Sequence, residues 1–139
     1  MQRHVRLPCA LLLGLAATGA WADNKQSWDY KSYQKDRASG QYSKERFVTS
    51  TITLDEKDGA ATFRMLTAGR GDPCINKGDL PAEVQRTPAT LVITVTPPLA
   101  GCEAFRYVIR NDGSGGVRQH RRDELWVEDG LDHGLTPSK

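Results

Sequence analysis

Apolar and polar residues alternate in short runs along most of the chain, with the period of two that places successive side chains on opposite faces of a β-strand. The run 47–54 places Ile52 and Leu54 on one face, and the run 60–68 repeats the alternation after an Asp/Gly-rich turn at 55–59. Two alternating runs joined by a short turn predict a β-hairpin. Further strands are predicted at residues 89–96, 102–110, 117–122 and 125–127.

Gly- and Pro-rich segments separate these runs. Residues 69–81 form a long predicted loop, and the Gly-rich run 112–116 predicts a turn. No segment of ten or more residues has a helical period, although 82–86, directly after Pro81, is compatible with a single turn of helix. Five to seven short strands with turns between them predict an all-β domain, built as a single small antiparallel β-sandwich or barrel.

The first 22 residues have the parts of a secretory signal peptide. Arg3 and Arg6 form a positive n-region, an apolar run follows at 7–17, and Ala20 and Ala22 place small residues where a signal peptidase reads them. The apolar run is too short to anchor a protein across a bilayer. We therefore predict cleavage near Ala22, a periplasmic or secreted product and no transmembrane span.

The mature chain is expected to consist of an arm and a domain. Residues 23–40 are polar with aromatic residues at Trp28, Tyr30 and Tyr33, which predicts an extended N-terminal arm anchored by its rings. Residues 41–139 are expected to form the β domain, which ends in a polar C-terminal tail.

Signal cleavage also changes the charge and the cysteine count. It removes Arg3, Arg6 and Cys9, so 17 Lys and Arg face 17 Asp and Glu, and the net charge is zero with His neutral. A neutral domain has no long-range field that attracts nucleic acid, so we expect no nucleic-acid partner. The remaining Cys74 and Cys102 predict one disulfide in an oxidising compartment. Free thiols or a metal pair are the alternatives, but zinc would need two more ligands, so no metal and no cofactor are expected.

One hairpin concentrates arginines. A five-residue connection at 112–116 places Arg110 opposite Arg118 and Arg106 opposite Arg122, with all of these on one face. The predicted binding face consists of Arg106, Arg110, Arg118, His120 and Arg122. Like charges that face each other destabilise a sheet, and the guanidinium fork suits carboxylate and phosphate. The pattern therefore predicts a docking face for an acidic protein surface or an anionic polymer.

Two alternatives stay open for this face. A four-residue connection would bring Val117, Gln119 and Arg121 onto the face of Arg106 and Arg110 instead. Five carboxylates that follow the hairpin could also fold back and neutralise the arginines. These carboxylates belong to Asp123, Glu124, Glu128, Asp129 and Asp132.

Candidate catalytic chemistry is sparse. A small hydrolase of wall sugars would need two carboxylates, for which Glu103, Glu124 and Glu128 are available. A phosphodiester-cleaving site would use His120 and His133, although their charged neighbours predict that both lie on the surface. The tripeptide at 70–72, Arg-Gly-Asp, matches a receptor-binding motif, but three residues match by chance often.

In size, export and fold class the chain is similar to the small disulfide-bonded β proteins of bacterial envelopes, which include inhibitors of wall-degrading enzymes and immunity partners of secreted toxins. Fold class does not determine function, and no motif carries over residue by residue. The sequence favours a non-enzymatic exported binding module for an acidic protein or an anionic envelope component. A small periplasmic hydrolase and a structural subunit of an envelope assembly are the alternatives.

Overall fold

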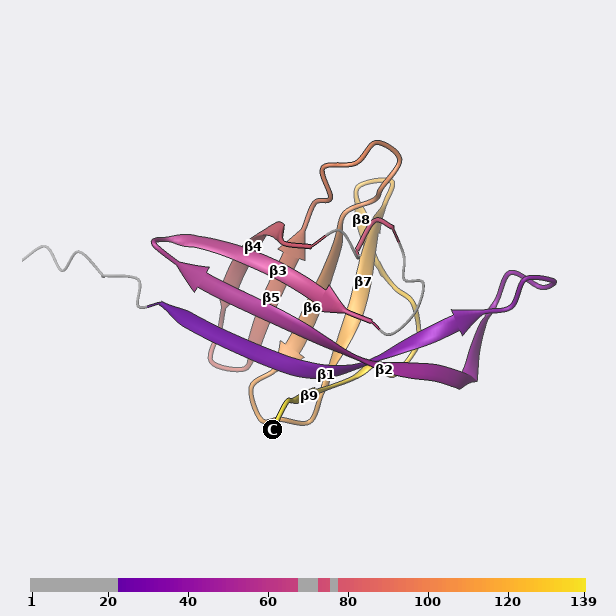
Figure 1. The fold of residues 1–139 in the computed structure, drawn as a ribbon, viewed down its shortest axis with the longest axis horizontal. Coiled ribbons are helices and arrows are strands. Elements are labelled where there is room, and N and C mark those ends of the chain that lie inside the picture. Colours follow the sequence, from indigo (N-terminus) through magenta and orange to yellow (C-terminus); the bar gives the residue numbers. More distant parts are fainter. Residues whose placement is uncertain (1–22, 68–72, 76–77) are drawn as a thin grey trace, which may run out of the picture.

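The computed structural model of the protein describes residues 23–67, 73–75 and 78–139, and these residues form nine strands and no helix. The strands are β1 (Asn24–Lys35), β2 (Tyr42–Lys57), β3 (Ala60–Leu66), β4 (Leu80–Arg86), β5 (Thr90–Val95), β6 (Phe105–Arg110), β7 (Gly116–Arg122), β8 (Leu125–Glu128) and β9 (Gly134–Pro137). They form one antiparallel sheet in the order β8-β7-β6-β5-β4-β3-β2-β1-β9 (Figure 1). The predicted all-β antiparallel class is confirmed, whereas the predicted count of five to seven strands is wrong.

The additional strands are β1, β4 and β9, whose sequences show little alternation. β1 covers most of the segment 23–40, and it pairs with β2 and β9 as an integral part of the sheet. β4 includes the segment 82–86 that was compatible with a helical turn, so that interpretation is wrong. Its pairing with β5 along five residues outweighs the weak local preference, because sheet formation depends on neighbours more than on propensity.

The sheet curls so that its β9 end lies against the start of β7. A Cβ added to Gly115 would lie 2.6 Å from the carbonyl oxygen of Gly134, and one added to Gly116 would lie 3.1 Å from Leu135 Cδ1. Only glycine permits this approach. No pairing of β7 with β9 occurs in the described residues, so the fold is one open, curled sheet rather than the predicted sandwich or closed barrel.

The core fills the inside of the curl, and we call this side of the sheet its inner face and the other side its outer face. Aromatic rings occupy its centre, where Phe63 stacks on Tyr107 with ring centroids 5.6 Å apart and meets Phe105 edge to face. Trp28 and Tyr30 of β1 are also buried. Aliphatic residues complete the core, among them Ile52, Leu54, Leu80, Ile93, Val95 and Leu135.

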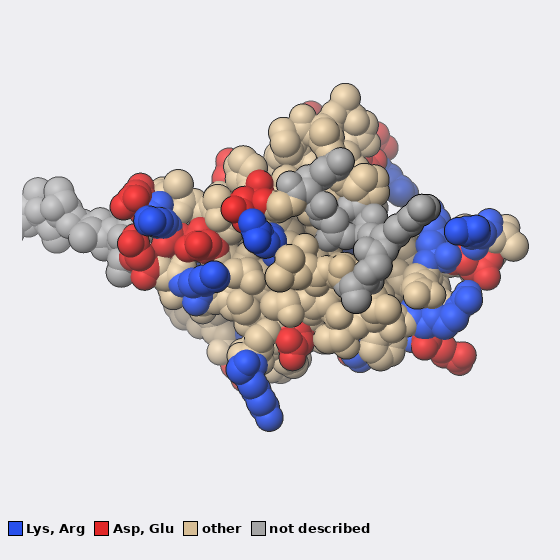
Figure 2. All heavy atoms as spheres, in the orientation of Figure 1, with Lys and Arg blue, Asp and Glu red and all other residues tan. Residues whose placement is uncertain are grey.

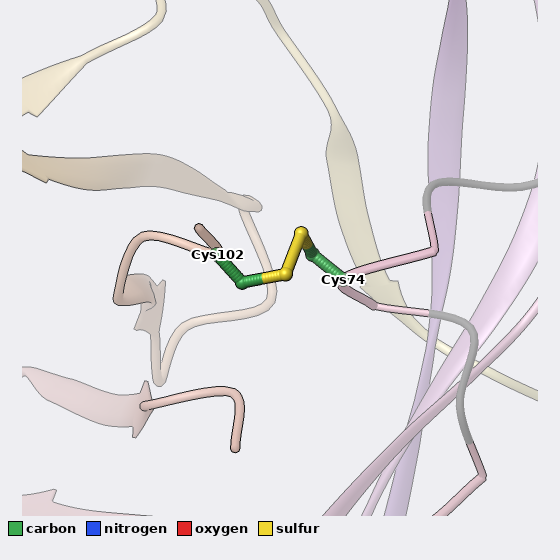
Figure 3. The surroundings of a disulfide bond; sticks show 2 residues. All are labelled: Cys74 and Cys102. Atoms are coloured by element: carbon green, nitrogen blue, oxygen red, sulfur yellow. A yellow bond between two sulfur atoms is a disulfide. The ribbon is translucent and has the colours of Figure 1, made fainter. Parts of the chain in front are cut away.

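The predicted disulfide is confirmed. Cys74, in the loop between β3 and β4, is bonded to Cys102, in the loop before β6, with Cα atoms 5.5 Å apart (Figure 3). The bond ties these two loops together, and Ile75, the neighbour of Cys74 in the chain, is buried.

Two sequence predictions fall outside the described residues, namely the signal peptide at 1–22 and the Arg-Gly-Asp tripeptide at 70–72. Within the described part of the chain there is no helix with the length and apolar character that crossing a bilayer requires.

Candidate functional site

The β6–β7 hairpin does not have the register that a five-residue connection predicts. Tyr107 pairs with Arg118, and Arg106 pairs with Gln119. The turn is tighter because Arg110 N–H donates to the Gly115 carbonyl at 2.8 Å, while Asp112 Oδ1 accepts the Ser114 N–H at 2.9 Å. The partner of each β6 residue is therefore three positions earlier than predicted. An odd shift exchanges the two faces of a strand, so the four arginines do not share one face.

Arg106 and Arg110 lie on the outer face, where their own hairpin already binds them. The Nε of Arg106 donates to Gln119 Oε1 at 2.6 Å, and its guanidinium lies 4.4 Å from the centre of the Trp126 ring. Arg110 donates to Ser114 from both Nε and Nη2, at 2.6 and 3.0 Å. The face composition is the one that the four-residue alternative predicted.

Arg118, His120 and Arg122 lie on the inner face, in line with core residues Phe105 and Tyr107 of the neighbouring strand. There they line a cleft of about 440 Å³. The facing wall of the cleft comes from the disulfide loops, with Cys74, Ile75, Gly101 and Glu103. The sequence missed this site because it depends on the register and on the approach of distant loops.

Two further lining residues come from the β1–β2 hairpin, which projects beyond the rest of the sheet (Figure 1). Lys35 and Tyr42 are cross-strand partners there, just beyond a register shift that follows Tyr33. Such a bulge redirects the side chains after it, which no local pattern in the segment 23–40 indicates. Lys and Arg side chains lie among Asp and Glu side chains at this end of the molecule (Figure 2).

The cations of the cleft outnumber its carboxylates. Lys35, Arg118 and Arg122 face Glu103 and Asp129, which leaves a net charge of +1 with His120 neutral. None of the three cations forms an ion pair with another described residue. Of the five carboxylates that could neutralise the arginines, Asp129 lines the cleft and interacts electrostatically with Arg118, although the two form no ion pair.

Arg118 is the most buried of the three cations. Its Nε is buried without a hydrogen-bond partner in the described structure, and its guanidinium lies 5.5 Å from the centre of the Phe105 ring. Burial opposes the charged form, but interaction with Tyr107, Tyr30 and Asp129 favours it and raises the pKa of Arg118 above its ordinary value. The cleft thus holds a permanent, partly desolvated positive charge.

Asp129 is directed toward His133 rather than toward Arg118. The Nε2 of His133 lies 2.5 Å from Asp129 Oδ2, and its Nδ1 lies 3.0 Å from the Lys31 carbonyl oxygen. Because a carbonyl only accepts, Nδ1 must carry a hydrogen and donate. Burial acts to raise the pKa of Asp129, but hydrogen bonds from His133 and the Leu131 N–H outweigh it and lower that pKa.

His133 is buried, so the prediction that it lies on the surface is wrong. It is 2% exposed and stacks on Tyr30, with ring centroids 4.8 Å apart. Both ring nitrogens of His133 have hydrogen-bond partners, so neither has a free lone pair for a substrate. These bonds connect β1 to the segment before β9. The sequence did not predict this role because Lys31 lies 102 residues before His133 in the chain. Asp129 is only four residues away, but the local sequence does not show that both side chains turn into the interior.

The hydrolase residues do not converge either. Glu103 lines the cleft, whereas Glu128 accepts a hydrogen bond from Gln119 outside it and Glu124 lies in the exposed turn between β7 and β8. No group of three or more His, Cys, Asp or Glu in the described residues is arranged to hold a metal ion.

A second hollow of about 270 Å³ lies beside the β2–β3 turn. Alanines Ala60, Ala61 and Ala82 form much of its wall, and its Glu56 is already paired with Arg86 at 2.5 Å. Its single cation, Lys57, is outnumbered by Glu56 and Glu83, so the hollow has a net negative charge and the cationic cleft is the candidate site for an anion. Comparison with protein-family models, curated proteins and solved structures finds no match for this chain.

Proposed function

We propose that the protein is an exported, non-enzymatic binding module whose cationic cleft receives an anionic group of an acidic protein or an anionic envelope component. The observation that carries this proposal is the guanidinium of Arg118, partly buried with an unpaired Nε. A charged group in such a place is stabilised by an anion that accepts its hydrogen bonds, and a bond of this kind contributes about 1.5–3 kcal/mol.

The surrounding residues fit an anionic ligand. His120 and Arg122 follow Arg118 on the inner face of β7 and form with it what we call the positive strip, in which the two arginines carry the charge. Lys35 adds an ammonium from the β1–β2 hairpin. Carboxylate and phosphate both suit a guanidinium fork. Binding of this type is what an inhibitor or an immunity protein requires when it docks on an acidic surface.

The experiment compares two double variants of the same hairpin, Arg118→Gln/Arg122→Gln on the inner face and Arg106→Gln/Arg110→Gln on the outer face. Both remove two positive charges. Binding of labelled poly-L-glutamate and of inorganic polyphosphate is followed by fluorescence anisotropy at fixed ionic strength. We expect the inner pair to lose at least tenfold in affinity and the outer pair to lose less than threefold. Equal losses for the two pairs, or no binding by the parent protein, would refute the proposal.

A further inference from the structure

The two ends of the sheet differ in how well they are protected. β9 carries Pro137 and lies against β7, where Gly134 approaches Gly115. β8 pairs with β7 on one side and with no other described strand. It contains no proline and no lysine, the residues that commonly protect an exposed edge.

The backbone groups of β8 that face outward can be assigned from its register. Arg122 pairs with Leu125 across a two-residue turn, and the Asp129 N–H donates to the Arg118 carbonyl at 3.4 Å. Bonded and non-bonded pairs alternate in an antiparallel ladder, so Leu125, Val127 and Asp129 are directed toward β7. The N–H and C=O groups of Trp126 and Glu128 therefore point away from β7 and have no strand beside them.

This open edge borders the cationic cleft. Val127 is the cross-strand partner of His120, and Leu125 is the partner of Arg122, so these side chains share the inner face. Leu125 is 68% exposed and Val127 is 37% exposed. An apolar strip thus lies between the positive strip of β7 and the free backbone of β8.

We propose that the ligand of the cleft is an extended acidic segment of a partner protein, which adds a strand beside β8. This inference rests on the proposed function and specifies its partner. A strand added there would lie roughly 10 Å from β7, because neighbouring strands are about 4.8 Å apart. A glutamate on the inner face of that strand would pack its methylene groups on Leu125 or Val127 and bring its carboxylate to Arg122 or His120.

The positive charge of the cleft and the free backbone groups of β8 together favour an acidic peptide over other anions. An anionic polysaccharide or polyphosphate satisfies the cations but has no regular row of peptide groups to pair with Trp126 and Glu128. An acidic peptide in the extended conformation satisfies both, and alternation of its side chains places every second residue over the cleft.

The test uses a ten-residue capped peptide in which Glu and Thr alternate. Two further versions carry N-methyl groups on every second amide, one on the Glu positions and one on the Thr positions, without a change of charge. We expect the parent peptide to bind, one of the N-methylated versions to lose at least tenfold in affinity, and the amides of Trp126 and Glu128 to become protected from hydrogen exchange.

Two variants of the protein isolate the edge. Glu128→Pro removes an outward N–H, and Glu128→Ala removes the same side chain but keeps the N–H. Peptide affinity should be at least fivefold lower for the proline variant than for the alanine variant, with thermal unfolding checking that both fold. Equal affinities of the two variants would overturn the strand addition.

The other outcomes separate this inference from the proposed function. If all three peptides bind equally, or if polyphosphate binds and no peptide does, strand addition is wrong and the proposed anion-binding function of the cationic cleft stands. If neither polyphosphate nor any peptide binds, both proposals fail. Concentration-dependent protection of the β8 amides without peptide would show that a second copy of the chain occupies the edge, which also overturns the inference.

Discussion

Replacement of Arg118 by Met should increase the stability of the protein while it abolishes anion binding. Methionine keeps the unbranched apolar stem, so packing against the inner face is retained. The guanidinium, in contrast, has a buried Nε without a partner and no ion pair among the described residues. The substitution also removes two stabilising interactions of the guanidinium. One is the contact with Phe105, 5.5 Å from the guanidinium carbon to the ring centre, and the other is the electrostatic interaction with Asp129.

The expected change in the free energy of unfolding is the penalty of the unsatisfied Nε donor less the stabilising interactions that the guanidinium makes. An unsatisfied buried donor destabilises the folded state by about 1–3 kcal/mol, and the partial exposure of Arg118 places it at the lower end of that range. The contact with the ring contributes about 0.5–1 kcal/mol at a partly exposed position. We therefore expect the free energy of unfolding of Arg118→Met to rise by no more than about 0.5 kcal/mol, which corresponds to a rise in Tm of about 2 °C or less for a domain of this size.

The assay is urea denaturation of the oxidised protein, with the slope of the transition compared between variants. Arg106→Met is the matched control, because Arg106 donates to Gln119 at 2.6 Å and stacks on Trp126. The free energy of unfolding of that variant should be about 1 kcal/mol lower than that of the parent, as expected for the loss of a hydrogen bond to a charged group on the surface of a sheet. If Arg118→Met instead loses more than about 1 kcal/mol, Arg118 has a structural role and the argument for an anion-binding cleft is wrong.

Three further predictions concern stability. Replacement of Cys74 and Cys102 by Ala opens a loop with a sequence separation of 28, and the chain-entropy model predicts a loss of about 3–4 kcal/mol in urea denaturation; a loss below about 1 kcal/mol would contradict it. The pKa of Asp129 is lowered by folding, so its contribution is present above the unfolded pKa and is lost as the pH falls through the folded pKa. Asp129→Asn should therefore flatten the acid side of the profile of unfolding free energy against pH, and an unchanged acid side would show that the contact with His133 does not couple to folding. Glu124 has a φ of 64°, in the left-handed region that glycine adopts without strain, so Glu124→Gly should raise Tm by a stabilisation of about 0.5 kcal/mol, whereas a lower Tm would mean that the turn is not strained.

Local alternation was sufficient to locate the strands that supply most of the core. The predicted runs 47–54, 60–68, 89–96 and 102–110 overlap β2, β3, β5 and β6, because each of them buries every second side chain. The disulfide was also predictable, since the predicted signal cleavage would remove Cys9 and leave an even number of cysteines. Strand β1 was not predicted because its only buried apolar residues are Trp28 and Tyr30, which is too few to show a clear alternation. Strand β9 was not predicted because Leu135 is its only buried residue.

The sequence by itself determined that arginines and a histidine alternate along β7, but only the tertiary structure decided which face they occupy. That choice depends on the turn, where Asp112 caps Ser114 and the pairing moves by three residues. A strand has two faces and a period of two, so a change of one position in a turn exchanges core and solvent for every residue after it. The cleft itself arises where β7, the β1–β2 hairpin and the disulfide loops meet, and contacts between segments so far apart leave no local pattern in the chain.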